Sequence, residues 1–303
     1  MLRLHLIQNK EGQPHPITRT YVALEQAGVQ KCSMRKLSVK ELSASVFTAL
    51  LLICSGALAA DGADAGPWAA GGNSRARLLA AGPLQAGLYV AGIEIELKGS
   101  AHTYWRNPGD AGVPPLLKTE GSRNVKSAVL RFPAPQRMDE NGLTVFGYRS
   151  NLVLPLDVTP LDAKAPVHLV LQFTYAACEK ICVPAELSGT LALKPDAAVS
   201  GAAARLEDAR RRLPQQIDAK LLGITAEAQG PKDKPVWRVA LQVPARELFV
   251  EGPSGWFFET KQAAGAFDIT AAERPKDWTG LVPVTLTVTG TKDYEVGFEL
   301  PLP

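Results

Sequence analysis

Two strand-like segments lie on either side of a close cysteine pair, and this arrangement constrains the fold more than any other feature. In residues 167–175 apolar and polar side chains alternate, and residues 187–193 also read as a strand. Between them stand Cys178 and Cys182. Residues four apart in an extended chain are separated by about 13 Å, whereas a disulfide needs Cα atoms within about 7 Å. The chain must therefore bend if the pair closes, which places both thiols at a hairpin rim that a partner can reach.

Short alternating segments recur after residue 60, with Pro and Gly clusters between them. The clearest are residues 93–97, 128–132 and 152–158 in the first half, and 237–243, 256–259, 282–289 and 294–300 in the second. Several short strands at this spacing predict an all-β fold. We expect one β-sandwich domain at 60–195 and a second, smaller one at 215–303.

A short helix is predicted between the two sandwiches, at residues 202–214. Leu206 and Leu213 lie on one side of it, and Pro214 ends it. The basic triplet Arg210–Arg212 complements the C-terminal end of the helix dipole, and we interpret it as a solvated last turn of a connector. The second sandwich contains no chemical motif, and we expect its aromatic residues in the core: Trp237, Trp256, Phe257, Phe258 and Trp278.

An export signal is predicted near the amino terminus. Basic residues, an apolar run and the small-residue pattern at 57–59 follow Met34 in that order. We therefore predict a leader at 1–59 whose signal peptide occupies 34–59, and export to the periplasm. The alternative is an uncleaved membrane anchor at 44–60, but a run of about 17 residues is marginal for spanning a bilayer.

Removal of that leader leaves a nearly neutral chain. Residues 1–59 hold seven of the 33 Lys and Arg residues and three of the 30 Asp and Glu residues, so the balance after cleavage is about −1. Such a chain offers no broad basic surface for nucleic acid. No later stretch reaches the roughly 18 apolar residues of a transmembrane helix, so we expect a product that is soluble after cleavage.

Cys178 and Cys182 are the cysteines that remain after cleavage. As a structural staple, their five-residue ring would contribute only about 2 kcal/mol, and a chain with this much core scarcely needs it. A small ring is better suited to exchange, in which one thiolate attacks a partner's disulfide and the second resolves the mixed intermediate. We therefore favour a redox pair over a staple.

Several motifs along residues 88–193 point to one family. They are HTYWRNPGD from His102, FPAP from Phe132, FGY from Phe146, LPL from Leu154 and CEKICVPAE from Cys178. With these motifs the segment resembles the amino-terminal periplasmic domain of the thiol:disulfide interchange protein DsbD, and more closely that of its copper-sensitivity relative ScsB. The resemblance implies an immunoglobulin-like sandwich, and we expect the second domain to be of the same class.

The resemblance also implies partners and residue roles. The cysteine pair is expected to accept electrons from a membrane-embedded thiol reductase and to pass them to periplasmic thioredoxin-like proteins. Cys182 matches the cysteine that attacks or is attacked first, and Cys178 would resolve. Phe146 is similar to an aromatic cap that gates access to the pair. The other residues expected along the approach are Tyr104, Trp105, Arg106 and Tyr148.

The sequence departs from the DsbD pattern in two respects. Three residues separate its cysteines, fewer than in DsbD itself, and Thr144 and Val145 replace the acidic residues beside the DsbD cap. We also find no multi-span electron-delivering domain and no terminal thioredoxin-like domain in the sequence. We therefore expect the reductant of the pair to be a separate polypeptide.

Two other function classes stay open beside the predicted thiol-disulfide oxidoreductase of the protein-disulfide reductase type. Two thiolates bind Cu(I) readily, and with His102 as a further ligand Cys178 and Cys182 would make a Cu(I)-binding chaperone for copper tolerance. A zinc site needs about four ligands, and beyond the cysteines the cleaved chain offers only His102, His168 and carboxylates. We expect no resident metal or cofactor. The third class is a module that only docks a partner and whose cysteines are vestigial.

Overall fold

The computed structural model describes residues 65–231 and 233–301. These residues belong to one compact unit that begins at Ala60. The predicted leader at 1–59 and its signal peptide lie outside the described residues. Within the described ranges, no helix has the length and apolar character needed to cross a membrane.

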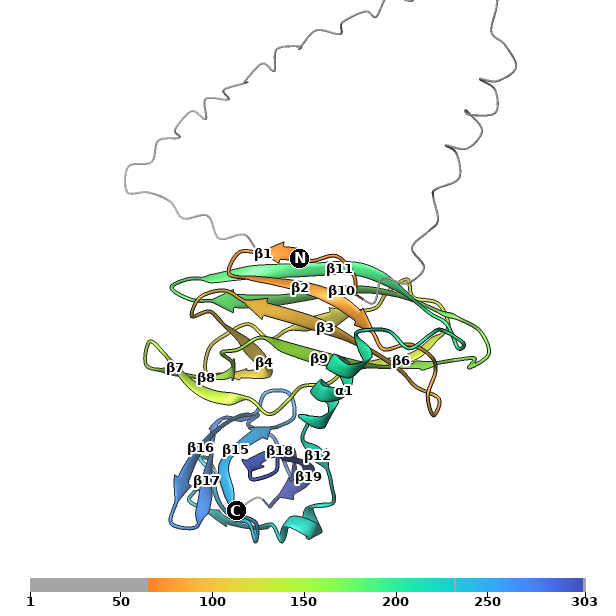
Figure 1. The fold of residues 1–303 in the computed structure, drawn as a ribbon. Coiled ribbons are helices and arrows are strands. Elements are labelled where there is room, and N and C mark those ends of the chain that lie inside the picture. The colour runs from red at the N-terminus through yellow and green to blue at the C-terminus, as the bar shows by residue number, and fades with distance from the viewer. Residues whose placement is uncertain (1–64, 232, 302–303) are drawn as a thin grey trace, which may run out of the picture. The chain divides into compact units, whose positions relative to one another are not determined.

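Most of the described residues form β-strands, which confirms the predicted all-β class (Figure 1). The strands lie in four sheets, two built from residues 69–193 and two from residues 215–300. Buried side chains from both sheets of a pair share one hydrophobic core. Each pair is therefore a β-sandwich.

The first sandwich consists of a five-stranded and a six-stranded sheet. The five-stranded sheet has the order β1 (Ala69–Gly71), β2 (Ser74–Ala80), β3 (Tyr89–Leu97), β9 (Leu152–Pro160) and β6 (Val125–Leu130). The six-stranded sheet has the order β11 (Cys182–Leu193), β10 (Val167–Cys178), β4 (His102–Gly109), β8 (Leu143–Tyr148) and β7 (Gln136–Glu140), with β5 (Leu116–Lys118) also paired to β10.

The predicted hairpin around the cysteines is formed by β10 and β11. The two strands are antiparallel and pair without interruption from Val167 opposite Leu193 to Cys178 opposite Cys182. Strand β10 extends beyond its predicted end because Tyr175 to Cys178 are all buried, which hides the alternation that marks a strand in the sequence, and β11 begins at Cys182 instead of Leu187. Both faces of the sheet are therefore covered up to the cysteine pair.

The predicted helix is present as α1 (Ala203–Arg211), which packs on the five-stranded sheet through the fully buried Leu206. The charges of its basic triplet are balanced within the chain. Arg210 pairs with Asp157 of β9, and Arg211 and Arg212 both pair with Asp208 of the helix. The three arginines are thus paired with acidic neighbours, as expected of a solvated last turn.

The second sandwich consists of two four-stranded sheets. One has the order β12 (Gln215–Gln216), β19 (Tyr294–Leu300), β18 (Val282–Gly290) and β15 (Ala245–Glu251), and the short helix η1 (Ala219–Leu222) follows β12 in the chain. The other has the order β13 (Thr225–Gln229), β14 (Val236–Ala240), β17 (Ala266–Glu273) and β16 (Phe257–Ala263). Strands β12, β13, β15 and β17 were not among the segments that the sequence pattern picked out, and neither were β1, β2, β4, β5, β7 and β8 of the first sandwich.

Trp237 and Trp256 are buried in the core of the second sandwich, and Phe258 and Trp278 pack against it, as predicted. The prediction is wrong for Phe257, which is 52% exposed. Neighbouring residues of a strand point to opposite faces of the sheet, so Phe257 and Phe258 cannot both face the core.

Candidate functional site

Cys178 and Cys182 form a disulfide at the rim of the first sandwich. They are the last residue of β10 and the first residue of β11, directly opposite one another, with Cα atoms 3.9 Å apart. Glu179, Lys180 and Ile181 make the turn between them. The bend that the sequence required is therefore a three-residue hairpin turn.

The disulfide lies on the outer face of the six-stranded sheet. Along β10, Phe173, Tyr175 and Ala177 point into the main core, whereas Ala176 and Cys178 point to the opposite face. There they form a small separate cluster of buried residues, which we call the disulfide face: Tyr104, Met138, Val145, Ala176 and Cys178. The pair thus rests on an apolar patch of its own instead of the core of the sandwich.

The two sulfur-bearing residues differ in exposure. Cys178 is 1% exposed, because β4 and the β7–β8 hairpin cover it. Cys182 is exposed, and the neighbouring Ile181 is 72% exposed. A visiting molecule can therefore reach Cys182 while Cys178 stays protected.

One hydroxyl group lies against both sulfur atoms. The Tyr104 Oη is 3.1 Å from the Cys178 Sγ and 3.3 Å from the Cys182 Sγ. It donates a hydrogen bond to the Glu140 Oε2 at 2.8 Å, since a carboxylate can only accept, and the disulfide sulfurs have no proton to donate to it. Burial, and then the hydrogen bond to Glu140 and its negative charge, raise the pKa of Tyr104, so the phenol keeps its proton.

Glu140 and His102 complete the polar surroundings of the pair. The Glu140 Oε1 is 3.6 Å from the Cys182 Sγ, and the Glu140 Oε2 is 3.5 Å from the His102 Nε2. His102 pairs with Cys178 in the ladder of β4 and β10, and its ring meets that of Tyr104 edge-on. Its Nε2 is buried and has no hydrogen-bond partner within the described part of the chain.

A second carboxylate anchors the turn. The Glu179 Oε1 accepts hydrogen bonds from the Ser100 Oγ at 2.8 Å and from the Ser100 backbone N–H at 3.3 Å. These hydrogen bonds lower the pKa of Glu179. The turn is thus tied to the loop between β3 and β4.

The structure does not bring the expected cap to the sulfurs. On β8, Val145 belongs to the disulfide face and the next residue, Phe146, points into the main core. The Phe146 ring contacts Phe249 of β15 at a centroid distance of 5.0 Å. The expectation that Phe146 covers the pair is therefore corrected, since strand alternation turns it away.

Three of the four expected approach residues also lie elsewhere. Trp105 follows Tyr104 on β4 and is buried against Phe249, with ring centroids 5.8 Å apart. Arg106 bonds Glu251 through two nitrogens and also pairs with Glu295, both in the second sandwich. Of this expected set, only Tyr104 contacts the cysteines.

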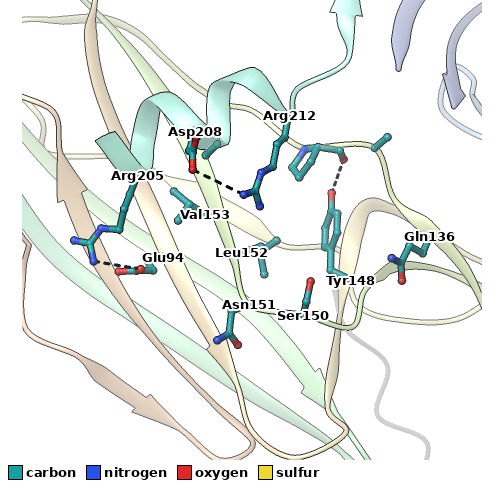
Figure 2. A pocket seen from close by; sticks show the side chains of 13 residues that line it. Glu94, Gln136, Tyr148, Ser150, Asn151, Leu152, Val153, Arg205, Asp208 and Arg212 are labelled. Carbon is teal, nitrogen blue, oxygen red and sulfur yellow. Dashed lines mark hydrogen bonds and ion pairs between the residues drawn. The ribbon is translucent and has the colours of Figure 1, made fainter. Parts of the chain in front are cut away.

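Tyr148 lines a hollow between α1 and the first sandwich, and its hydroxyl donates to the Pro133 carbonyl (Figure 2). The charged groups of this hollow pair with each other: Arg205 with Glu94 and Arg212 with Asp208. Neither cysteine is among its lining residues. The hollow is therefore separate from the disulfide.

Sequence reasoning missed Glu140, Met138 and Ser100. A signal for Glu140 was present, because it precedes Asn141-Gly142, a dipeptide typical of tight hairpin turns. Both turn residues have positive φ, at 56° and 86°. This turn folds β7 back on β8 and carries the carboxylate to the sulfurs.

Comparisons with known proteins agree with this fold. Residues 77–192 match the family described as thiol:disulfide interchange protein DsbD, N-terminal. The crystal structure of the N-terminal periplasmic domain of ScsB from Proteus mirabilis is similar, with a TM-score of 0.62 and 16% sequence identity over 79% of this chain and 99% of that chain. None of the curated proteins matches the chain. The likeness to the ScsB domain extends well beyond residues 77–192.

Proposed function

Because residues 77–192 form a domain of the DsbD amino-terminal family, we propose that the chain exchanges disulfides with partner proteins through Cys178 and Cys182. The observation that carries the proposal is the unequal exposure of the pair. An exchange protein needs one sulfur that a partner's thiolate can reach and a second that is protected until the mixed disulfide forms. Cys182 and Cys178 meet these two needs.

The reaction starts with a partner thiolate that attacks the Cys182 Sγ. A bond forms between the two proteins, the bond to Cys178 breaks, and Cys178 leaves as a thiolate. A second partner thiolate then attacks the partner's own sulfur in the mixed disulfide and Cys182 leaves as a thiolate, so that the partner becomes a disulfide and this chain a dithiol, with two electrons gained. The reverse sequence passes those electrons to the next disulfide, with Cys182 as the attacking thiolate and Cys178 as the resolving one.

Tyr104 is placed to assist the leaving sulfur. A new thiolate on Cys178 lies beside the Tyr104 hydroxyl, which can turn from Glu140 to donate to it over a starting distance of 3.1 Å. The site is sheltered, so this hydrogen bond to an anion is stronger than one between neutral groups. Tyr104 thus favours the reduced form of the pair.

We further propose that the chain acts in the periplasm, between a membrane-embedded thiol reductase and thioredoxin-like recipients, in support of copper tolerance. The periplasmic origin of the similar ScsB domain supports the location. A glutathione titration tests the relay. A midpoint potential well above about −300 mV supports it, because structural disulfides lie below that value. A lower potential contradicts the relay and supports a staple.

The assignment of the two cysteines is tested with a chromogenic disulfide, 5,5′-dithiobis(2-nitrobenzoate), on the full chain with Cys32 and Cys54 replaced by serine. In that background, Cys178→Ser leaves the exposed thiol and Cys182→Ser leaves the buried one. We expect the first variant to react at least about tenfold faster, because access controls thiol exchange. Equal or reversed rates contradict the assignment, and unreactive thiols in both variants favour a module that only docks partners.

A further inference from the structure

We propose that the reduced pair is also a zinc site, formed by Cys178, Cys182, His102 and Glu140. The observation that points to a ligand is the buried ring nitrogen of His102, which is unpartnered in the described part of the chain. Its side chain is more than nine-tenths buried, and its Nε2 has no hydrogen-bond partner within the described residues although it faces the Glu140 carboxylate at 3.5 Å. A buried ring nitrogen without a partner costs stability, and such a group therefore points to a cation or a proton donor that binds there in another state of the protein.

The donor atoms are already close together. One ligand atom from each of His102, Glu140 and Cys178 lies within 4.8 Å of the others. Zinc bonds of about 2.0–2.3 Å place the ligands of a tetrahedral site about 3.3–3.8 Å apart, so the side chains need to contract by only about 1 Å. Reduction frees the Cys182 Sγ, 3.6 Å from the Glu140 Oε1, as the fourth ligand.

The supporting residues hold these donors in place. His102 and Cys178 are opposite one another in the ladder of β4 and β10, so their separation is fixed by the sheet. The Tyr104 hydroxyl donates to the Glu140 Oε2 and leaves Oε1 directed at Cys182. A hydrogen bond of this kind orients a ligating carboxylate and raises the affinity of a metal site.

The composition of the donor set favours zinc over Cu(I). Two thiolates, one imidazole and one carboxylate make the four-coordinate set of nitrogen, sulfur and oxygen ligands that Zn²⁺ accepts. Cu(I) prefers soft sulfur ligands and would leave the carboxylate of Glu140 unused. Removal of the carboxylate therefore distinguishes the two ions, because it should weaken zinc binding and leave Cu(I) binding unchanged.

Zinc binding would couple to the exchange reaction, and in this respect the inference rests on the proposed function. The two thiols release two protons when they bind Zn²⁺, and no electron is transferred. The ion binds the dithiol and not the disulfide, so it stabilises the reduced form and occupies the attacking Cys182. Once free zinc exceeds its dissociation constant, each further tenfold increase in its concentration raises the midpoint potential by about 30 mV.

The test uses the full chain with Cys32→Ser and Cys54→Ser, reduced with a phosphine and freed of reductant, in competition with a chromogenic zinc chelator. We expect one Zn²⁺ per chain, no binding to the oxidised protein, and affinity at least tenfold lower for His102→Ala and for Glu140→Gln. His168→Ala and Glu120→Gln serve as matched controls and keep the wild-type affinity, since both residues lie away from the pair. Cooperative thermal unfolding of each oxidised variant verifies its fold.

Co²⁺ provides a second readout, because a tetrahedral thiolate site gives intense visible bands and a thiolate-to-cobalt charge-transfer band. Absence of zinc binding to the reduced protein overturns the proposal. It is also overturned if both variants bind zinc as tightly as the wild type, which would mean a site made of thiolates alone. The serine variants and the chromogenic disulfide test exchange without metal, so the two proposals can fail separately.

Discussion

The six-stranded sheet of the first sandwich has two unlike faces near the end of β10. On the disulfide face, Tyr104 lies beside Cys178 and a carboxylate. On the other face, which we call the joint face, Trp105 and Phe146 lie in the main core against Phe249 of the second sandwich. Residues that are neighbours in the sequence thus serve a reactive surface and a structural contact.

This difference separates two physical roles. The joint face is closed, with buried aromatic rings beneath the guanidiniums of Arg106 and Arg137, so its side chains contribute stability through burial. The disulfide face has a small apolar floor with polar groups around an exposed sulfur. Its side chains therefore change the free energy of the reduced pair relative to the disulfide. Substitutions on the joint face should therefore change the free energy of unfolding, and those on the disulfide face should change the redox potential.

The largest effect is expected from Phe249→Ala. Phe249 is fully buried and contacts two aromatic rings of the first sandwich, so its truncation should lower the free energy of unfolding by about 3–5 kcal/mol. Urea unfolding measures this, and Phe257→Ala, at an exposed position of the same sandwich, should stay within about 0.5 kcal/mol of wild type. A shift in the midpoint potential of folded Phe249→Ala protein would contradict the separation of the two faces.

A smaller loss is expected from Arg106→Met. The guanidinium is mostly buried between Glu251 and Glu295, and its removal leaves two carboxylates close together without their cation. We expect a loss of about 2–3 kcal/mol by urea unfolding, because breaking a sheltered ion pair strands the remaining charge. Arg238→Met removes a more exposed pair with Asp268 and should cost less than about 1 kcal/mol. Equal losses for the two variants would show that the Arg106 contacts are solvated.

Tyr104→Phe should act on the potential. Loss of the hydroxyl removes a hydrogen bond to the Cys178 thiolate, worth about 1 kcal/mol, and thereby lowers the midpoint potential by about 20 mV. A glutathione titration of the disulfide measures the shift. Tyr148→Phe is the matched control, because its hydroxyl bonds the Pro133 carbonyl and lies in a separate hollow. If both variants shift the potential equally, contact with the sulfurs is not the cause.

The smallest effect concerns the turn. The pKa of Glu179 is lowered by the hydrogen bonds from Ser100, so the charged carboxylate holds the turn above the ordinary Glu range and releases it as pH falls through the lowered pKa. The Ser100 amide proton shift, followed by NMR, should stay constant through about pH 4.5 and move only below it. Glu179→Gln should abolish this titration, whereas Glu120→Gln should leave it intact. A Ser100 transition at the ordinary Glu pKa would mean that the tether is absent in solution.

The sequence predicted the cysteine hairpin well, because alternation and the short cysteine spacing are local features, but it missed strands β4, β7 and β8, which surround the sulfurs. It predicted the residues around the sulfurs poorly. Tyr104 and Trp105 look alike as aromatic neighbours, and only the register of β4 against β8 and β10 decides which one meets Cys178. Phe249 lies far from Trp105 in the sequence, so no local pattern could reveal their contact.

The most direct test of the central claim is partial alkylation of the reduced chain with its cysteine pair intact. Iodoacetamide is added below one equivalent at neutral pH, and peptide mapping by mass spectrometry counts the label on each cysteine. An exposed Cys182 above a protected Cys178 predicts that Cys182 carries most of the label. Equal labelling, or a majority on Cys178, would contradict the unequal pair on which the exchange reaction depends.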